Sequence, residues 1–201
     1  YMRSRDITTT TDGRKLRSED SKRRIVSAML ELVREGRIAP TAEEVASRAQ
    51  VGLRTVFRRF KDMESLYAEM ARAIDDRLAG ISDEFVSQDD WRANLNQMID
   101  RRLRAYEIIM PYRVAAEALK FQSTILLTQH MKFVREERQR LLGLMPKILL
   151  SDAILTEGLE AALSFDMWNQ LRNDQRLAPN EAGDVVKRIV SSLLARYSGN
   201  T

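Results

Sequence analysis

Residues that break helices are scarce in this chain. Glycine and proline supply only 8 and 4 of its 201 positions, about half of the roughly 12% share found in average proteins. Sheets need frequent tight turns, which these two residues form most readily. The composition therefore argues against a sandwich, a barrel or a βα-repeat enzyme. We expect an all-α fold of a few long helices joined by short connections.

The prolines and the spacing of apolar residues divide the chain. Pro40, Pro111, Pro146 and Pro179 each stand between stretches with helical periodicity, as expected of a residue that breaks helical hydrogen bonds. A first amphipathic helix is predicted from Ser21 to a stop at Gly36. Further helices are predicted over residues 41–49, 53–60, 63–85, 90–109, 111–121, 124–145, 151–173 and 180–197.

Positive charge is concentrated at the N-terminal end. Residues 1–61 hold 15 of the 33 Lys and Arg but only 8 of the 29 Asp and Glu, whereas the remaining 140 residues are net acidic. A basic end on an acidic body predicts that the first part meets a polyanion. The absence of cysteine excludes disulfides and thiol chemistry. With no long apolar segment or signal core, we expect a soluble cytoplasmic protein. Because the chain has a single histidine and no nucleophile, phosphate-loop or metal-ligand spacing, we expect no cofactor and no enzymatic activity.

Residues 41–60 carry the most informative pattern. Thr41 to Glu44 fits a capping box, in which a threonine hydroxyl and a glutamate cap the start of a helix. Two short helices joined by a tight turn form the unit that places its second helix in a DNA major groove. At 100° per residue, one side of the second helix is predicted to pack on Val45 and Ala46, and the opposite side is predicted to be exposed. The packed side comprises Leu53, Val56, Phe57 and Phe60, and the presented side Arg54, Thr55, Arg58 and Arg59.

The presented residue types suit nucleic acid. Arginine can bind guanine with two donors or grip phosphates, and threonine can touch a thymine methyl group or a phosphate. The free N–H groups at the helix starts, Thr41 and Gly52, suit phosphate oxygens. The alternative interpretation is an ordinary solvated face on a surface helix.

Residues 22–66 resemble the DNA-binding domain of the tetracycline repressor (TetR) family of bacterial regulators. The matching residues are Ile25, Ala28, Leu30, Glu31, Leu32, Gly36, Thr41, Val45, Ala46, Ala49, the run 51–60, Glu64 and Leu66. The resemblance implies an N-terminal helix-turn-helix domain and a C-terminal helical domain for ligand binding and dimerisation. The DNA-binding residues that we predict are Thr41, Gly52, Leu53, Arg54, Thr55, Phe57, Arg58, Arg59 and Lys61.

Three positions depart from the family pattern. Gln50 stands where the family favours a glycine, a position that suits a left-handed backbone after a helix. Phe57 replaces the usual tyrosine, which keeps the ring and loses a phosphate-contacting hydroxyl. Met63 replaces a lysine that grips the DNA backbone, and Lys61 and Arg59 lie close enough to compensate.

The domain boundaries that we predict are a flexible basic arm over residues 1–19, the DNA-binding domain over 20–65 and the helical domain over 66–201. The arm carries five cations, Arg3, Arg5, Arg14, Lys15 and Arg17. Flexible basic arms can follow the minor groove, and many such tails make no specific contact. Both interpretations of the arm stay open.

The acidic body is rich in methionine and aromatic residues, which line adaptable hydrophobic pockets but also fill ordinary cores. The resemblance implies a small-molecule pocket between its helices. Our candidate ligand residues are Met98, Arg102, Tyr106, Met110, Arg113, Glu117, Phe121, His130, Met131 and Trp168. Arg113 and Glu117 can instead pair with each other, and His130, as the single histidine, builds no metal site or triad alone.

Residues 151–197 carry two wide apolar faces. One is formed by Ile154, Leu155, Leu159, Ala162, Leu163 and Trp168 and includes Gly158, Ala161 and Ala162, which are small enough for close helix approach. The other is formed by Val185, Val186, Ile189, Val190, Leu193, Leu194 and Tyr197. A helix that is apolar over such a wide arc needs more than one neighbour, and the resemblance implies a homodimer through these residues. An ordinary monomer core is the alternative.

Together these patterns predict a homodimeric, ligand-responsive transcriptional repressor that binds a near-palindromic operator and a small hydrophobic effector. Two other functions remain open. One is an architectural DNA-binding protein without an effector, and the other is a helical small-molecule carrier or enzyme with an incidental basic end.

Overall fold

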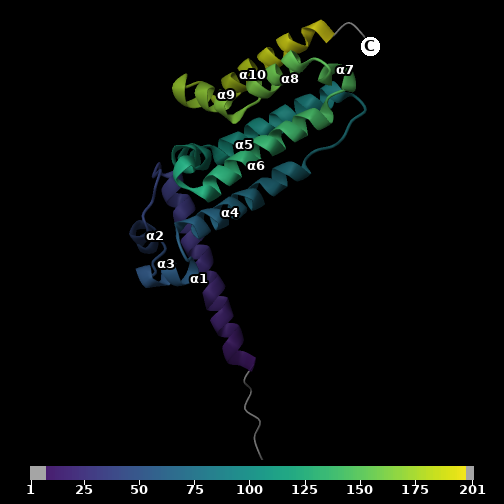
Figure 1. The fold of residues 1–201 in the computed structure, drawn as a ribbon. Coiled ribbons are helices and arrows are strands. Elements are labelled where there is room, and N and C mark those ends of the chain that lie inside the picture. Colours follow the sequence, from purple (N-terminus) through teal and green to yellow (C-terminus); the bar gives the residue numbers. More distant parts are fainter. Residues whose placement is uncertain (1–7, 198–201) are drawn as a thin grey trace, which may run out of the picture. The chain divides into compact units, whose positions relative to one another are not determined.

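The structure, a computed structural model, describes residues 8–197, and the side chains of residues 16, 18–81 and 84–197. Every regular element in this part of the chain is helical (Figure 1), so the expected all-α fold is confirmed. No helix in the described residues is both long and apolar enough to cross a lipid bilayer. The helices are α1 (Thr8–Arg34), α2 (Ala42–Arg48), α3 (Leu53–Arg59), α4 (Met63–Asp83), α5 (Trp91–Leu119), α6 (Thr124–Leu144), α7 (Lys147–Leu150), α8 (Ala153–Ala162), α9 (Phe165–Asn169) and α10 (Pro179–Leu194), with 3-10 turns at Lys120–Gln122 and Ala195–Tyr197 and a π-turn at Gln170–Asp174.

The described residues form two compact units. Unit 1 runs up to Asp75 and includes Pro111–His130, and unit 2 comprises Asp76–Met110 and the described residues from Met131 onward. The boundary at residue 65 that we expect between functional domains stays a prediction.

The core of unit 1 joins α1, α2 and α3 to the start of α4. Ile25, Val45 and Leu66 are completely buried in it, and Val56 of α3 is almost so. Tyr112 and Ala115 of α5 belong to the same cluster. Burying apolar area in this way is the main favourable contribution to folding, and it fixes α2 and α3 against α1.

The core of unit 2 is built around α5 and α8. Tyr106 is buried, its ring meets that of Phe165 edge-on at 5.5 Å, and its hydroxyl donates to the carbonyl of Leu163 at 3.0 Å. Helices α8 and α10 pack side by side (Figure 1), and Gly158 faces Leu193 across their contact.

Three predicted boundaries are wrong. Helix α1 begins at Thr8 instead of Ser21, because residues 14–22 are mostly good helix formers. Pro111 lies inside α5 and does not end it, since its neighbours Ile109 and Tyr112 are buried and packing can offset the cost of a proline. The predicted helix 151–173 is divided, because Ser164 caps a new helix at Phe165.

Candidate nucleic-acid interface

Helix α2 begins with the predicted capping box. The Thr41 hydroxyl accepts from the Glu44 amide at 3.2 Å, and the Glu44 carboxylate accepts from the Thr41 amide at 2.8 Å. Val45 and Ala46 face the core and are buried. The predicted capping box and the packing of this helix are therefore confirmed.

The turn after α2 requires a left-handed residue at Gln50, whose φ is 52°. The amide of Gln50 donates to the carbonyl of Ser47 at 3.1 Å, and that of Val51 donates to the carbonyl of Ala46 at 3.0 Å. This pair of bonds is the Schellman motif, which ends many helices. The left-handed backbone predicted at position 50 is confirmed, without the usual glycine.

Arg24 of α1 ties this turn to the rest of unit 1. Its guanidinium donates to the carbonyls of Ala49 at 2.6 Å and Gln50 at 3.1 Å. This contact was not predicted from the sequence. A cation on the first helix gives no local signal of a contact with carbonyls some 25 positions later.

Helix α3 meets the core through fewer residues than predicted. Val56 and Phe60 are buried, but Leu53 is 38% exposed and Phe57 is 51% exposed. The prediction that all four pack inside is therefore wrong. A helix of seven residues lies against its neighbours along one narrow strip, and the strip is centred between Val56 and Phe60.

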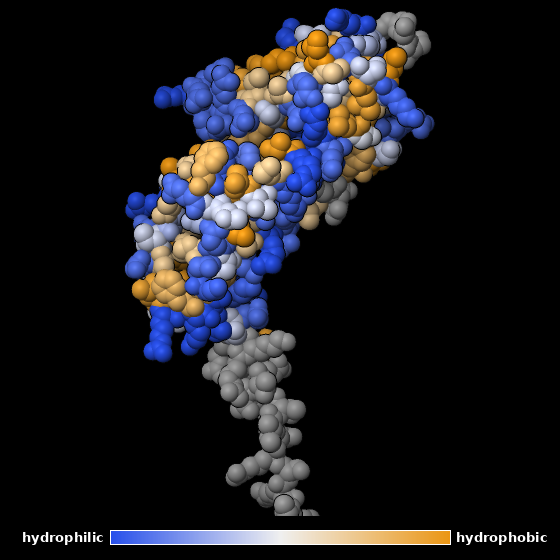
Figure 2. Space-filling model, in the orientation of Figure 1, coloured by the Kyte–Doolittle hydropathy of each residue, from blue (hydrophilic) through white to orange (hydrophobic). Residues whose placement is uncertain are grey.

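The exposed side of α3 carries cations without partners. Arg54, Arg58 and, just beyond the helix, Lys61 are exposed, and none of them makes a salt bridge or side-chain hydrogen bond within the described part of the chain. Over the α2–α3 region, hydrophilic and hydrophobic surface lie next to each other (Figure 2). Exposed guanidiniums of this kind can bind guanine edges or phosphates.

Three other predicted DNA-binding residues have different surroundings. Thr55 and Arg59 are half-buried, and the Arg59 guanidinium donates to the Ser18 hydroxyl of α1. The prediction that Arg59 is exposed together with Arg54 and Arg58 is therefore wrong. Gly52 caps α3 without a side-chain hydrogen bond. In the predicted basic arm, Arg3 and Arg5 and the side chains of Arg14, Lys15 and Arg17 lie outside the described residues.

The candidate ligand residues of unit 2 are mostly core. Met98, Tyr106 and Trp168 are buried. Arg102 is buried as well, and its guanidinium pairs with the Glu137 carboxylate at 2.6 Å. Met110 is half-buried, and Met131 is 57% exposed.

The candidate ligand residues of unit 1 include a charged cluster. The Glu117 carboxylate accepts from Arg113 at 2.8 Å, lies 2.6 Å from the Nδ1 atom of His130, and accepts from Lys120. Burial raises the pKa of Glu117, but the Lys120 hydrogen bond and the charges of Arg113 and His130 outweigh it, so the pKa lies below its ordinary value. Phe121 is 84% exposed. Of the four candidate ligand residues in unit 1, Arg113, Glu117 and His130 therefore contact one another, and Phe121 is exposed to solvent.

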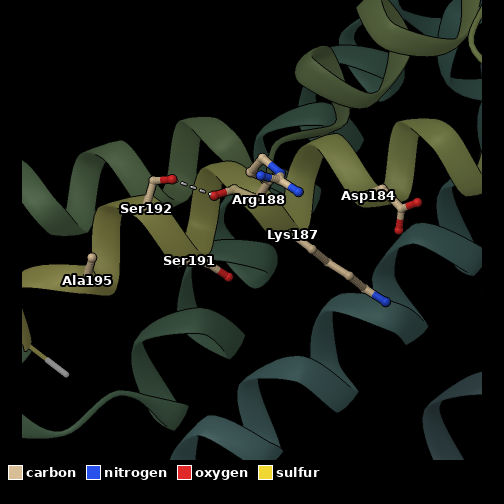
Figure 3. A pocket seen from close by; sticks show the side chains of 6 residues that line it. All are labelled: Asp184, Lys187, Arg188, Ser191, Ser192 and Ala195. Atoms are coloured by element: carbon tan, nitrogen blue, oxygen red, sulfur yellow. Dashed lines mark hydrogen bonds between the residues drawn. The ribbon is translucent and has the colours of Figure 1, made fainter.

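Two surface grooves lie in unit 2. One, of about 430 Å³, has Leu103, Trp168 and Gly183 among its lining residues, and Trp168 is its sole candidate ligand residue. The other, of about 710 Å³, is lined by five residues of α10 and by Ala195 of the 3-10 turn that follows it (Figure 3); here the Ser192 hydroxyl donates to the carbonyl of Arg188 at 2.9 Å. None of our candidate ligand residues lines this second groove.

The fold is similar to that of a transcriptional regulator from Rhodococcus sp. Rha1. Its crystal structure matches with a TM-score of 0.64 over 89% of this chain and 96% of that one, at 16% sequence identity. At this identity the likeness shows a shared fold. No protein-family model matches the sequence, and no curated protein is recognisably similar to it in sequence.

Proposed function

We propose that this chain is a transcriptional regulator of the TetR family that binds an operator in double-stranded DNA through α2 and α3. The observation that carries the proposal is the pair Arg54 and Arg58. Both are exposed on the second helix of a helix-turn-helix, and no anion of the described chain neutralises them. The major groove of DNA offers both guanine edges and phosphates to such side chains.

Two further observations support the proposal. The solved structure that shares the fold is described as a transcriptional regulator. The capping box at Thr41, the left-handed turn at Gln50 and the buried Val56 and Phe60 hold α3 on a rigid core. A rigid element positions base-reading side chains better than a loop does.

The regulator that we propose is a homodimer through residues 151–197. In α8, Ile154 is 87% exposed, and Ala161 is exposed beside the half-buried Gly158. In α10, Val185 and Ile189 are only half-buried. An exposed isoleucine beside small residues suits the close approach of a second copy. Much of the wide apolar face, including Leu159 and Val186, is already buried within one chain.

The proposal also includes repression that a small hydrophobic effector relieves. It is supported by the family resemblance. The groove of about 430 Å³ beside Trp168 has a largely charged lining that includes Asp100, Arg104 and Lys187, so it does not by itself favour a hydrophobic ligand. An effector would act by binding one dimer conformation better than the other, which is what coupling between two sites requires.

The test is a selection of bound duplexes from random DNA with the full chain, followed by gel shift and footprinting. We expect a near-palindrome with half-sites about 34 Å apart, or a multiple of that spacing. Binding to all sequences alike would instead indicate an architectural protein, because contacts to phosphates alone carry no sequence preference. Catalytic turnover of a small molecule without any DNA binding would indicate an enzyme.

A further inference from the structure

Helix α3 exposes two apolar side chains beside its two free guanidiniums. Leu53 and Phe57 are four residues apart and thus one turn apart on the same face, and Arg54 and Arg58 follow each of them by one residue. The core covers Val56 and Phe60 and leaves Leu53 38% exposed and Phe57 51% exposed. The helix therefore presents an apolar stripe and a cationic stripe side by side.

The chemistry of the two stripes points to one occupant. The cationic stripe, continued by Lys61, has no anionic partner in the described chain, so it favours a polyanion. On a base edge in the major groove, the apolar group is the C5 methyl of thymine, whereas guanine offers acceptors to arginine. Duplex DNA that places thymines next to guanines or phosphates matches both stripes.

We infer that Leu53 and Phe57 read thymine methyl groups, so that each operator half-site carries one or two thymines beside the positions bound by Arg54 and Arg58. This inference rests on the proposed function and names the bases that the same site recognises. Phe57 lacks the hydroxyl of a tyrosine and cannot donate to a phosphate, which leaves apolar contact as its contribution to binding.

The test removes single methyl groups from the DNA. In the duplex selected by the full chain, each thymine is replaced in turn by deoxyuridine, which keeps the base pair and loses the C5 methyl. We expect affinity to fall about 3- to 10-fold at one or two positions in each half-site, as burial of a methyl-sized group implies. This scan uses the unaltered protein and needs no variant to fold.

Variants then assign the methyl contacts. In Leu53→Ala or Phe57→Ala, the uracil effect should shrink to less than about twofold at one of those positions. Alanine favours helix, and circular dichroism checks that each variant is folded. Ile38→Ala is the matched control, because Ile38 is 49% exposed in unit 1 but lies outside α3. It should keep the full uracil effect.

The outcomes separate this inference from the proposed function. A sharp selected sequence that has no thymine in its protected half-sites, or that tolerates uracil everywhere, overturns the inference alone. Uracil effects that persist unchanged in both alanine variants also overturn it, since other residues would then read the methyl groups. A selection without any sequence preference overturns both.

Discussion

Two arginines of α3, Arg54 and Arg58, and two of unit 2, Arg102 and Arg172, have opposite surroundings. Arg54 and Arg58 are exposed and unpartnered among the described residues. In unit 2, Arg102 pairs with Glu137 at 2.6 Å, and Arg172 pairs with Glu107 at 2.8 Å. A count of charges along the sequence shows a basic end and an acidic body. The structure adds that Arg54 and Arg58 of α3 are left for an external anion, whereas Arg102 and Arg172 hold unit 2 together.

If this contrast is right, the largest effect on stability should follow from breaking a buried pair in unit 2. Arg102→Met removes the buried partner of Glu137, which keeps the exposed Arg140 and the Tyr106 hydroxyl, so we expect a loss of about 2–3 kcal/mol in the free energy of unfolding. Arg72→Met is the control, because the exposed pair of Arg72 with Glu69 should contribute less than about 1 kcal/mol. Urea unfolding measures both. Equal costs for the two variants would contradict the contrast.

The next largest effect is expected on dimerisation, at Ile154, an apolar side chain that unit 2 leaves exposed. In the proposed dimer Ile154→Asp places a charge in the interface, and we expect dimerisation to weaken by about 2 kcal/mol or more, roughly 30-fold. Because Ile154 is 87% exposed, the single chain loses little. Val86→Asp, at a residue that is 68% exposed elsewhere in unit 2, is the control. Sedimentation of an unchanged dimer in the Ile154 variant would exclude this interface.

A smaller effect is expected at the turn that presents α3. Gln50 has a φ of 52°, a conformation that costs a residue with a side chain about 1–2 kcal/mol. Gln50→Gly should therefore raise the free energy of unfolding by about 1 kcal/mol, less the extra freedom of glycine in the unfolded chain.

Gly36→Ala is the matched variant, for which we expect the opposite change in the free energy of unfolding. Gly36 has a φ of 95° and open space around it. An added side chain would therefore meet no neighbouring atoms and would be disfavoured only by the backbone conformation, so we expect the free energy of unfolding to fall by about 1 kcal/mol. Shifts of the same sign in the two variants would refute the assignment of strain to Gln50.

The smallest effect is a pH dependence in unit 1. The Lys120 hydrogen bond and the neighbouring charges hold the pKa of Glu117 below its ordinary value despite burial. The carboxylate thus stabilises the fold fully above the unfolded pKa of about 4.3, and this contribution is lost as the pH falls through the lower folded pKa. Glu117→Gln should lose less stability than the unaltered chain between pH 6 and pH 3.

The control for this pH effect is Asp89→Asn. Asp89 is exposed and makes no salt bridge within the described residues, so its replacement should leave the pH dependence as it is. Denaturant midpoints across the pH range give the comparison. A Glu117→Gln profile parallel to that of the unaltered chain would count against the stabilising role of the carboxylate.

Local signals in the sequence predicted local structure well. The capping box at Thr41, the stop at Gly36 and the left-handed backbone at Gln50 depend on residues within a few positions of one another, so their pattern is visible without the fold. The first residue of a helix and the continuity of a helix were harder to predict. Pro111 stays inside α5 because of packing that no local pattern reveals.

The candidate interface was predicted in part. Periodicity correctly placed Arg54 and Arg58 on the exposed side of α3, yet it put Leu53 and Phe57 inside. How a short helix is rotated depends on which strip meets α1 and α2, and its own sequence does not fix this. The position of Arg59 beside Ser18 depends on the early start of α1 at Thr8, which periodicity did not predict. The candidate ligand residues were chosen by residue type, which does not separate a pocket from a core.

The most direct test of the central claim is the affinity of Arg54→Ala/Arg58→Ala for the selected duplex and for a scrambled one. The unaltered chain should prefer the selected duplex by about 1,000-fold or more. In the folded, dimeric double variant this preference should fall by about two orders of magnitude or more, because each guanidinium contact with a base contributes about 1–3 kcal/mol. A double variant that keeps the full preference would contradict the claim that these two arginines read DNA.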